Sequence, residues 1–240
     1  MNRVVKRVLL GLVVVVVLCV GGLAGFIFWQ GQAGDDPAFF ESAIVAFEEM
    51  DAAEFPPAGA IVFVGSSSIR FWDTLAEDMA PLPTVRRGFG GAHMSHVIHN
   101  ARRIVTPYVP RAVVVFVGGN DIGSGKSVET VVGDFETFLE IMREELPEAD
   151  VWLLSMKPSK LRWSQWPAMA DVSRALEEFA DSHPRVRFVE TGRSLLGPDG
   201  TPDDVYIIDG LHLNAEGYRR WTEILKPQLL DAYAEVYGLE

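Results

Sequence analysis

The 240-residue sequence has almost no cysteine, and charged residues are missing from one long stretch. Cys19 is the only cysteine, so the chain cannot form an internal disulfide and its folded part must depend on a hydrophobic core. Residues 8–29 are 22 consecutive positions without a charged side chain, and no Asp or Glu precedes Asp35. The chain therefore divides into an apolar segment and an acidic one.

The apolar segment, residues 8–29, is long enough to span a membrane. A helix of this length measures about 33 Å, and a hydrocarbon layer is about 30 Å thick. Basic residues occur in the flank 1–7 (Arg3, Lys6 and Arg7), whereas the linker 30–36 has none. The positive-inside rule then predicts a single-pass anchor with a cytoplasmic N-terminus and an extracytoplasmic domain, either periplasmic or extracellular.

A cleaved signal peptide is the alternative for this segment. Small residues at positions 22 and 24, or at 31 and 33, could precede a cleavage site. The apolar run exceeds the length of about 7–15 residues that is usual for a signal peptide, which favours an uncleaved anchor.

The remaining segment is strongly acidic, with 33 Asp and Glu against the 18 Lys and Arg that follow residue 33. Such a charge excludes the basic surface that nucleic acids or anionic lipid headgroups require. The length of residues 37–240 suits one domain with a sizeable core.

Elements alternate along this domain. Apolar runs predict strands at 60–64, 84–89, 112–117, 151–154 and 186–189. Helical patterns occupy 37–50, 68–80, 92–105, 127–146, 168–182 and 215–236, the last beginning at a predicted Asn214 cap. Apolar strands separated by helices predict a three-layer α/β domain with a parallel sheet, whose ligands bind beyond the carboxyl ends of the strands.

Polar and glycine-rich segments follow three of these strands: Gly65-Ser66-Ser67-Ser68, Arg87-Gly88-Phe89-Gly90-Gly91 and Gly118-Gly119-Asn120-Asp121. Each of them alone could be an ordinary turn or helix cap. Near the C-terminus, Asp209 and His212 are three residues apart, so the carboxylate could accept the Nδ1 hydrogen of the imidazole. Together these segments supply a nucleophile, oxyanion donors, a base and a group that orients the base.

The same ordered set resembles the SGNH (GDSL-like) hydrolase superfamily over about residues 60–225. The resemblance rests on Ile61–Trp72, Gly91, Gly118-x-Asn120-Asp121 and Asp209-x-x-His212. Ser66 and Ala92 stand where many members have Asp, while Ser67 still aligns with the serine that is the nucleophile in that family.

The resemblance implies a flavodoxin-like fold with five parallel strands in the order 2-1-3-4-5. It implies Ser67 as nucleophile, with Ser66 and Ser68 as minor alternatives, His212 as base and Asp209 as its partner. The implied oxyanion hole consists of the backbone N–H groups of Ser67 and Gly91 and the Asn120 side chain, with no metal or organic cofactor.

We therefore expect a membrane-anchored ester hydrolase acting on small acyl esters or lipids such as lysophospholipids, without a nucleic-acid partner. A carbohydrate O-acetylesterase or acyltransferase of the cell envelope is one alternative, and a non-catalytic anchored scaffold is another.

Two further features are less specific. His93, His96 and His99 could suggest a metal site, but steps of three rotate each ring by about 60° on a helix, which favours ordinary helix-face residues. The connection 157–167 contains two tryptophans and three basic residues (Lys157, Lys160, Arg162, Trp163 and Trp166). It could form a wall of the substrate site or a surface loop.

Overall fold

Five short strands rich in β-branched residues form one parallel sheet in the order β2-β1-β3-β4-β5. In this computed structural model the strands are β1 (Ile61–Gly65), β2 (Thr84–Gly88), β3 (Ala112–Phe116), β4 (Asp150–Leu154) and β5 (Val186–Val189). Strands β1 and β3 are buried along their whole length, because helices cover both faces of the sheet. The predicted strand order and all five strands are confirmed, each within one residue at its ends.

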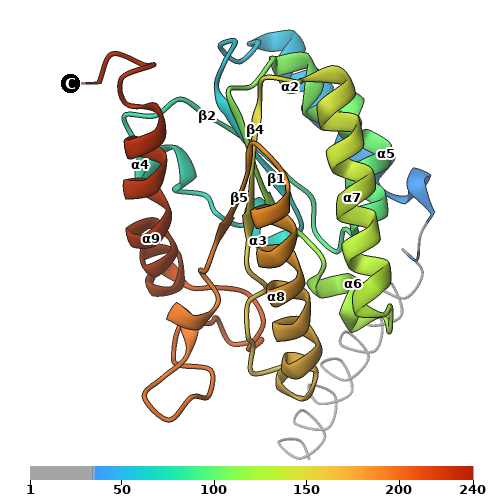
Figure 1. Cartoon of the computed structure of the whole chain (residues 1–240), viewed down its shortest axis with the longest axis vertical. Coiled ribbons are helices and arrows are strands. Elements are labelled where there is room, and N and C mark those ends of the chain that lie inside the picture. Colours follow the sequence, from blue (N-terminus) through green and yellow to red (C-terminus); the bar gives the residue numbers. More distant parts are fainter. Residues whose placement is uncertain (1–33, 35, 240) are drawn as a thin grey trace, which may run out of the picture. The chain divides into compact units, whose positions relative to one another are not determined.

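Helices form the two outer layers (Figure 1). One face carries α3 (Ser67–Arg70), α4 (Leu75–Met79) and α9 (Ala215–Tyr233), which pack on Phe63, Val114 and Trp152 through aromatic residues such as Trp72 and Trp221. The other face carries α2 (Glu41–Ala53), α5 (Met94–Ile104), α7 (Val128–Glu145) and α8 (Trp166–Ser182). The predicted three-layer α/β architecture is confirmed.

Short helical segments fill several connections of the domain: the 3₁₀ turns η1 (Pro37–Phe40), η2 (Thr106–Tyr108), η3 (Trp163–Gln165) and η4 (Arg193–Leu195), and the helix α6 (Gly119–Gly123). Asp36 caps η1 through the Ala38 N–H, and Asn214 caps α9 through the Gly217 N–H at 3.1 Å, as its sequence position predicts.

The single helix predicted over 68–80 is wrong. The chain breaks between α3 and α4, where the fully buried Trp72 turns inward against Tyr218 and Trp221 of α9. Asp78 accepts hydrogen bonds from Trp72 Nε1 at 2.6 Å and from Thr74 Oγ1 at 2.7 Å, and these bonds stabilise the break. Side-chain bonding of this kind competes with helix propagation.

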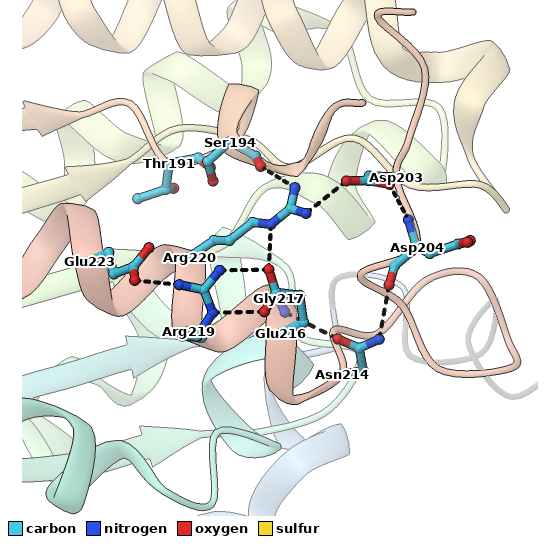
Figure 2. A network of polar contacts seen from close by, with 10 residues as sticks. All are labelled: Thr191, Ser194, Asp203, Asp204, Asn214, Glu216, Gly217, Arg219, Arg220 and Glu223. Atoms are coloured by element: carbon cyan, nitrogen blue, oxygen red, sulfur yellow. Dashed lines mark hydrogen bonds and ion pairs between the residues drawn. The ribbon is translucent and has the colours of Figure 1, made fainter. Parts of the chain in front are cut away.

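The segment that precedes α9 is fixed by a polar network (Figure 2). The Arg220 guanidinium donates to Glu216 at 2.9 Å, to the Ser194 carbonyl at 2.9 Å and to Asp203 at 2.7 Å. The Asn214 amide donates to the Asp204 carbonyl at 3.2 Å. The network attaches the long connection after β5 to the first turns of α9, and the turn that contains Asp209 and His212 lies between these two fixed points.

The structure describes Gly34 and residues 36–239. The predicted anchor 8–29, its flank 1–7 and most of the linker 30–36 lie outside the described residues. Within the described part of the chain, no helix combines the length and the apolar character needed to cross a bilayer. The described residues 36–239 form one compact unit.

Candidate active site

The turn that contains Ser67 follows β1 directly. Gly65 has φ 150°, and a Cβ at this position would lie 2.0 Å from the Phe116 carbonyl oxygen of β3. Only glycine fits here, and it lets the chain turn sharply so that Ser67 begins α3 at the carboxyl end of the sheet. The flanking residues Ser66 and Ser68 are both buried.

Ser67, His212 and Asp209 form a continuous hydrogen-bonded row. Asp209 Oδ2 lies 2.6 Å from His212 Nδ1, and His212 Nε2 lies 2.9 Å from Ser67 Oγ. A carboxylate can only accept, so Nδ1 carries the hydrogen of the neutral ring and Nε2 is free to accept the Ser67 hydroxyl hydrogen. The structure thus brings Ser67 into hydrogen-bonding contact with His212, which lies 145 positions later in the sequence.

Backbone amides and an aromatic ring hold this row in place. The other carboxylate oxygen of Asp209 accepts the N–H groups of Leu211 at 2.9 Å and His212 at 3.0 Å. The ring of Phe71 meets the imidazole edge to face, with 4.9 Å between the ring centroids. The orientation of the imidazole is therefore fixed by Asp209 at Nδ1 and by the contact with the Phe71 ring.

Burial and charge set the protonation of the pair. Burial lowers the pKa of His212 below its ordinary value, against the opposing effect of Asp209, and the positive charges of Lys157 and Arg162 lower it further. For Asp209, burial alone would raise the pKa, but the hydrogen bonds from His212 and Leu211 outweigh it and the pKa is lowered. Both shifts favour a neutral imidazole beside an ionised carboxylate near neutral pH.

The three N–H donors predicted for the oxyanion hole belong to Ser67 itself, to Gly91 in the loop after β2, and to Asn120 in α6 after β3. The backbone N–H groups of Ser67 and Gly91 have no acceptor in the described chain. Gly91 adopts φ 87°, a conformation that favours glycine. Asn120 donates one amide hydrogen to the Ala92 carbonyl at 3.0 Å, which ties it to the loop of Gly91 and leaves its second amide hydrogen available.

Arg162 supports Asn120, a role that sequence reasoning did not assign. Its Nη1 donates to Asn120 Oδ1 at 3.0 Å and to the Gly119 carbonyl at 2.9 Å. Both bonds come from one charged nitrogen, so the amide oxygen of Asn120 is held and its nitrogen is directed away from the guanidinium. Arg162 lies in a connection without periodic pattern, and its basic character was the only signal in the sequence.

The connection 157–167 forms one wall of a cleft beside Ser67. We call this the Ser67 cleft; it contains about 370 Å³ of open space, including the solvent at its mouth. Its lining comprises Ser66, Ser67, Ser68, Phe116, Gly119, Asn120, Lys157, Ser159, Arg162, Met169 and Leu211. Lys160 instead pairs with the exposed Asp204 at 2.5 Å, and the Trp163 and Trp166 rings stack on each other at 6.2 Å.

The same connection is bonded to the turn of Asp209 and His212. The Leu161 N–H donates to the Gly210 carbonyl at 3.0 Å, and Lys157 Nζ donates to the Leu211 carbonyl. At the edge of the turn, the Tyr206 hydroxyl donates to the Pro158 carbonyl at 2.7 Å. The wall of the cleft and the turn of Asp209 and His212 thus form one hydrogen-bonded unit.

Two of the three histidines after the second strand have a capping role. The His93 N–H donates to His96 Nδ1 at 3.0 Å, and both rings are buried at the start of α5, while His99 is exposed. The described residues contain no group of three His, Cys, Asp or Glu side chains arranged to hold a metal. The histidine spacing therefore reflects a helix start.

The fold and the geometry at its strand ends are those of an ester hydrolase. The chain belongs to the GDSL-like Lipase/Acylhydrolase family, whose model matches residues 58–220. This range includes all the predicted site residues.

Comparisons with individual proteins agree with this family. The alpha2 subunit of platelet-activating factor acetylhydrolase IB from Gallus gallus is 26% identical over 176 residues, which cover 70% of this chain and 73% of the relative. A Streptococcus pneumoniae structure described as a platelet activating factor has a TM-score of 0.71 and 21% identity, covering 88% of this chain and 98% of that one. A GDSL-like lipase from Bacteroides thetaiotaomicron has a TM-score of 0.67 and 20% identity, covering 79% and 98%. These two structures are similar in fold.

Proposed function

We propose that this protein is a serine ester hydrolase in which Ser67 is the nucleophile, His212 the general base and Asp209 the group that orients and stabilises the imidazole. The observation that carries the proposal is the row of bonds from Asp209 through His212 to Ser67, at 2.6 Å and 2.9 Å. Ser66 and Ser68 flank the nucleophile, but neither hydroxyl forms a hydrogen bond with the imidazole.

The reaction follows from this geometry. Ser67 Oγ attacks the ester carbonyl while His212 Nε2 accepts the hydroxyl proton, and the new oxyanion accepts hydrogen bonds from the N–H groups of Ser67 and Gly91 and from Asn120. His212 returns the proton to the departing alcohol, leaving an acyl group on Ser67. Water then attacks the acyl-enzyme by the same route, releasing the acid and restoring the hydroxyl.

A fluorophosphonate probe tests the nucleophile. Peptide mass spectrometry should find the phosphonyl group on Ser67, and Ser67→Ala should abolish both labelling and hydrolysis of 4-nitrophenyl acetate. Ser66→Ala and Ser68→Ala are matched controls, because they remove neighbouring hydroxyls and should still be labelled on Ser67. Hydrolysis by Ser67→Ala at the wild-type rate would exclude the proposed nucleophile, and a folded wild-type chain that resists the probe would support a non-catalytic scaffold.

The preferred acyl group in this proposal is short. Polar side chains outnumber apolar ones in the lining of the Ser67 cleft, whose apolar members are Phe116, Met169 and Leu211, so the cleft offers little apolar surface to a long acyl chain. The relative from Gallus gallus is, by its name, an acetylhydrolase, which supports the same choice. With 4-nitrophenyl esters of increasing chain length, kcat/KM should be highest for acetyl to butyryl groups. A maximum at a long acyl chain would favour a lysophospholipase activity instead.

A carbohydrate O-acetylesterase of the cell envelope is the second candidate. Solved structures of similar fold include an acetyl-xylooligosaccharide esterase from Geobacillus, at 14% identity and a TM-score of 0.56. Release of acetate from acetylated oligosaccharides faster than from simple acetyl esters would favour this candidate. Transfer of the acetyl group to a second saccharide, followed by mass spectrometry, would distinguish an acyltransferase.

We also propose that residues 8–29 anchor the protein and that residues 37–240 lie outside the cytoplasm. The support is the uncharged run of 22 residues, which has basic residues in its N-terminal flank 1–7 and none in the linker 30–36. The full chain should stay in the membrane fraction after alkaline extraction, and external protease should digest the domain in spheroplasts. A shortened, freely soluble chain would instead indicate a cleaved signal peptide.

A further inference from the structure

The charge of the Ser67 cleft is opposite to that of the domain around it. The chain has 33 Asp and Glu against 21 Lys and Arg overall. The described residues that line the cleft nevertheless include two cations, Lys157 and Arg162, and no carboxylate. A concave site lined by one sign of charge concentrates ligands of the other sign.

Lys157 is a buried cation in the cleft with an incomplete set of hydrogen bonds. Its side chain is buried, with the residue 8% exposed, and the Leu211 carbonyl is its one hydrogen-bond acceptor in the described chain. An ammonium group has three N–H donors, so two of them lack an acceptor there. Burial, together with the smaller effect of the nearby Arg162, lowers the pKa of Lys157 to about 7 against the weaker attraction of Asp209. A bound anion would offset this cost of burying the charge.

Two buried hydroxyls add donors to the same cleft. Ser66 and Ser68 are 6% and 1% exposed, and neither hydroxyl takes part in a hydrogen bond with the described chain. Hydroxyl and ammonium donors without acceptors, in a cleft without carboxylates, match the oxygens of an anionic group.

We propose that the Ser67 cleft is a subsite for an anionic group of the substrate, a carboxylate or a phosphate, that is held by Lys157 together with the Ser66 and Ser68 hydroxyls. This inference rests on the proposed function of Ser67, and it narrows the substrate class to esters that carry a negative charge near the scissile bond. The charge can belong to the acyl group or to the alcohol, and the two arms of the experiment below distinguish these sources.

The experiment compares anionic esters with neutral esters of nearly the same shape. For the alcohol side the pair is 4-acetoxybenzoate and its methyl ester; for the acyl side it is mono-4-nitrophenyl adipate and 4-nitrophenyl hexanoate. Wild-type protein should show a lower KM for the anionic member of at least one pair. Lys157→Gln keeps a donor for the Leu211 carbonyl and removes the charge, so it should raise that KM by about tenfold and change the neutral ester's KM by less than about twofold.

Arg70→Gln is the matched control. Arg70 is exposed, forms no ion pair with the described residues and does not line the cleft. It lies near Ser67, because a Cβ added to Gly90 would be 3.1 Å from Arg70 Nη1 and 4.0 Å from Ser67 Cβ. If the anion binds in the cleft, this substitution should raise the KM of the anionic ester by less than about twofold. If Arg70→Gln raised the KM of the anionic ester as much as Lys157→Gln does, the electrostatic potential at the mouth of the cleft would account for the preference for anionic esters. That result would overturn the proposal.

Two other outcomes would also overturn it. Wild-type KM values that are equal within both pairs would show that no anion is selected. A fall in kcat of equal size for all four esters in Lys157→Gln would show that Lys157 only positions the turn of His212. Should Lys157→Gln fail to fold, wild-type inhibition decides: 4-hydroxybenzoate or adipate should compete at least about tenfold more strongly than its neutral amide, and equal inhibition would overturn the proposal.

Failure of this inference differs from failure of the proposed function. If only the subsite is wrong, the neutral esters are still hydrolysed and Ser67→Ala is still inactive. If Ser67 is not the nucleophile, Ser67→Ala hydrolyses neutral and anionic esters alike.

Discussion

Replacing Arg162 with Met should slow the reaction by weakening the position of Asn120. The substitution removes both bonds from Arg162 Nη1, at 3.0 Å to Asn120 Oδ1 and at 2.9 Å to the Gly119 carbonyl. Asn120 keeps its bond to the Ala92 carbonyl at 3.0 Å, so its amide should become less well oriented and not be lost from the site.

The expected magnitude lies between two limits. One oxyanion donor contributes about 2.7–4 kcal/mol to the transition state, which is the most that misplacing Asn120 could cost. A hydrogen bond from a charged donor contributes about 1.5–3 kcal/mol. With one of the two anchors of Asn120 retained, we expect a loss of about 1.5–2 kcal/mol, which corresponds to a fall in kcat of about 10–30-fold.

The assay is a double-mutant cycle on 4-nitrophenyl acetate, a neutral ester that does not test the charge of the cleft. Asn120→Ala should lower kcat by about 10²–10³. Adding Arg162→Met to Asn120→Ala should lower it by less than about threefold more, because the group that Arg162 positions is already gone. Arg162→Lys keeps the positive charge but lacks the planar guanidinium group, so its kcat should lie between those of Arg162→Met and the wild type.

Arg174→Met is a control for the loss of an arginine, since Arg174 pairs with Asp171 on the exposed surface of α8. Its kcat should equal that of the wild type. If Arg162→Met costs as much in the Asn120→Ala background as in the wild type, while thermal denaturation shows both proteins folded, the positioning role of Arg162 is refuted.

Two further predictions concern pH and stability. In the proposed mechanism the neutral imidazole of His212 is the active form, and burial lowers its pKa, so kcat/KM should rise with pH to a half-maximum below pH 6.5. Asp209→Asn removes an interaction that raises this pKa, so it should shift the half-maximum lower still and reduce kcat by up to about 10⁴. A half-maximum above pH 6.5 in a pH–rate profile would contradict this assignment. Asp51→Asn removes the carboxylate that pairs with Arg87, whose side chain is only 4% exposed, and should lower the free energy of unfolding in urea by about 3 kcal/mol without changing kcat. Glu144→Gln, which breaks the exposed pair with Arg102, should cost less than about 1 kcal/mol, and equal losses for the two variants would refute the role assigned to burial.

Much of the fold could be predicted from the sequence because its strands are apolar throughout and separated by helical patterns. β1 and β3 each consist of five buried residues, so burial, length and flanking glycines all indicate strands. The break after α3 could not be predicted, because Trp72 and Leu75 fit a helical spacing and only the tertiary contacts of Trp72 with α9 interrupt it. Met50 fits the helical spacing of residues 37–50 but is 60% exposed, because spacing alone does not show where the covering layer ends.

The candidate site was predictable where its residues directly follow strands or form a short-range pair. Ser67 and Asn120 come after β1 and β3, and the separation of Asp209 and His212 permits their bond. Lys157 and Arg162 were located in a connection that could line the site, but their contacts depend on the path of a segment without periodicity. No spacing rule links Arg162 to Asn120, which lies 42 positions earlier.

The bonds between the connection 157–167 and the turn of Asp209 and His212 have a consequence for protein engineering. Loop grafting assumes that the loop which selects the substrate can be exchanged while the catalytic residues stay in place. Here Lys157 and Leu161 bond the carbonyls of Leu211 and Gly210, one and two residues before His212. An exchanged connection would therefore shift the base along with the wall, and new specificity would require the two segments to be redesigned as a pair.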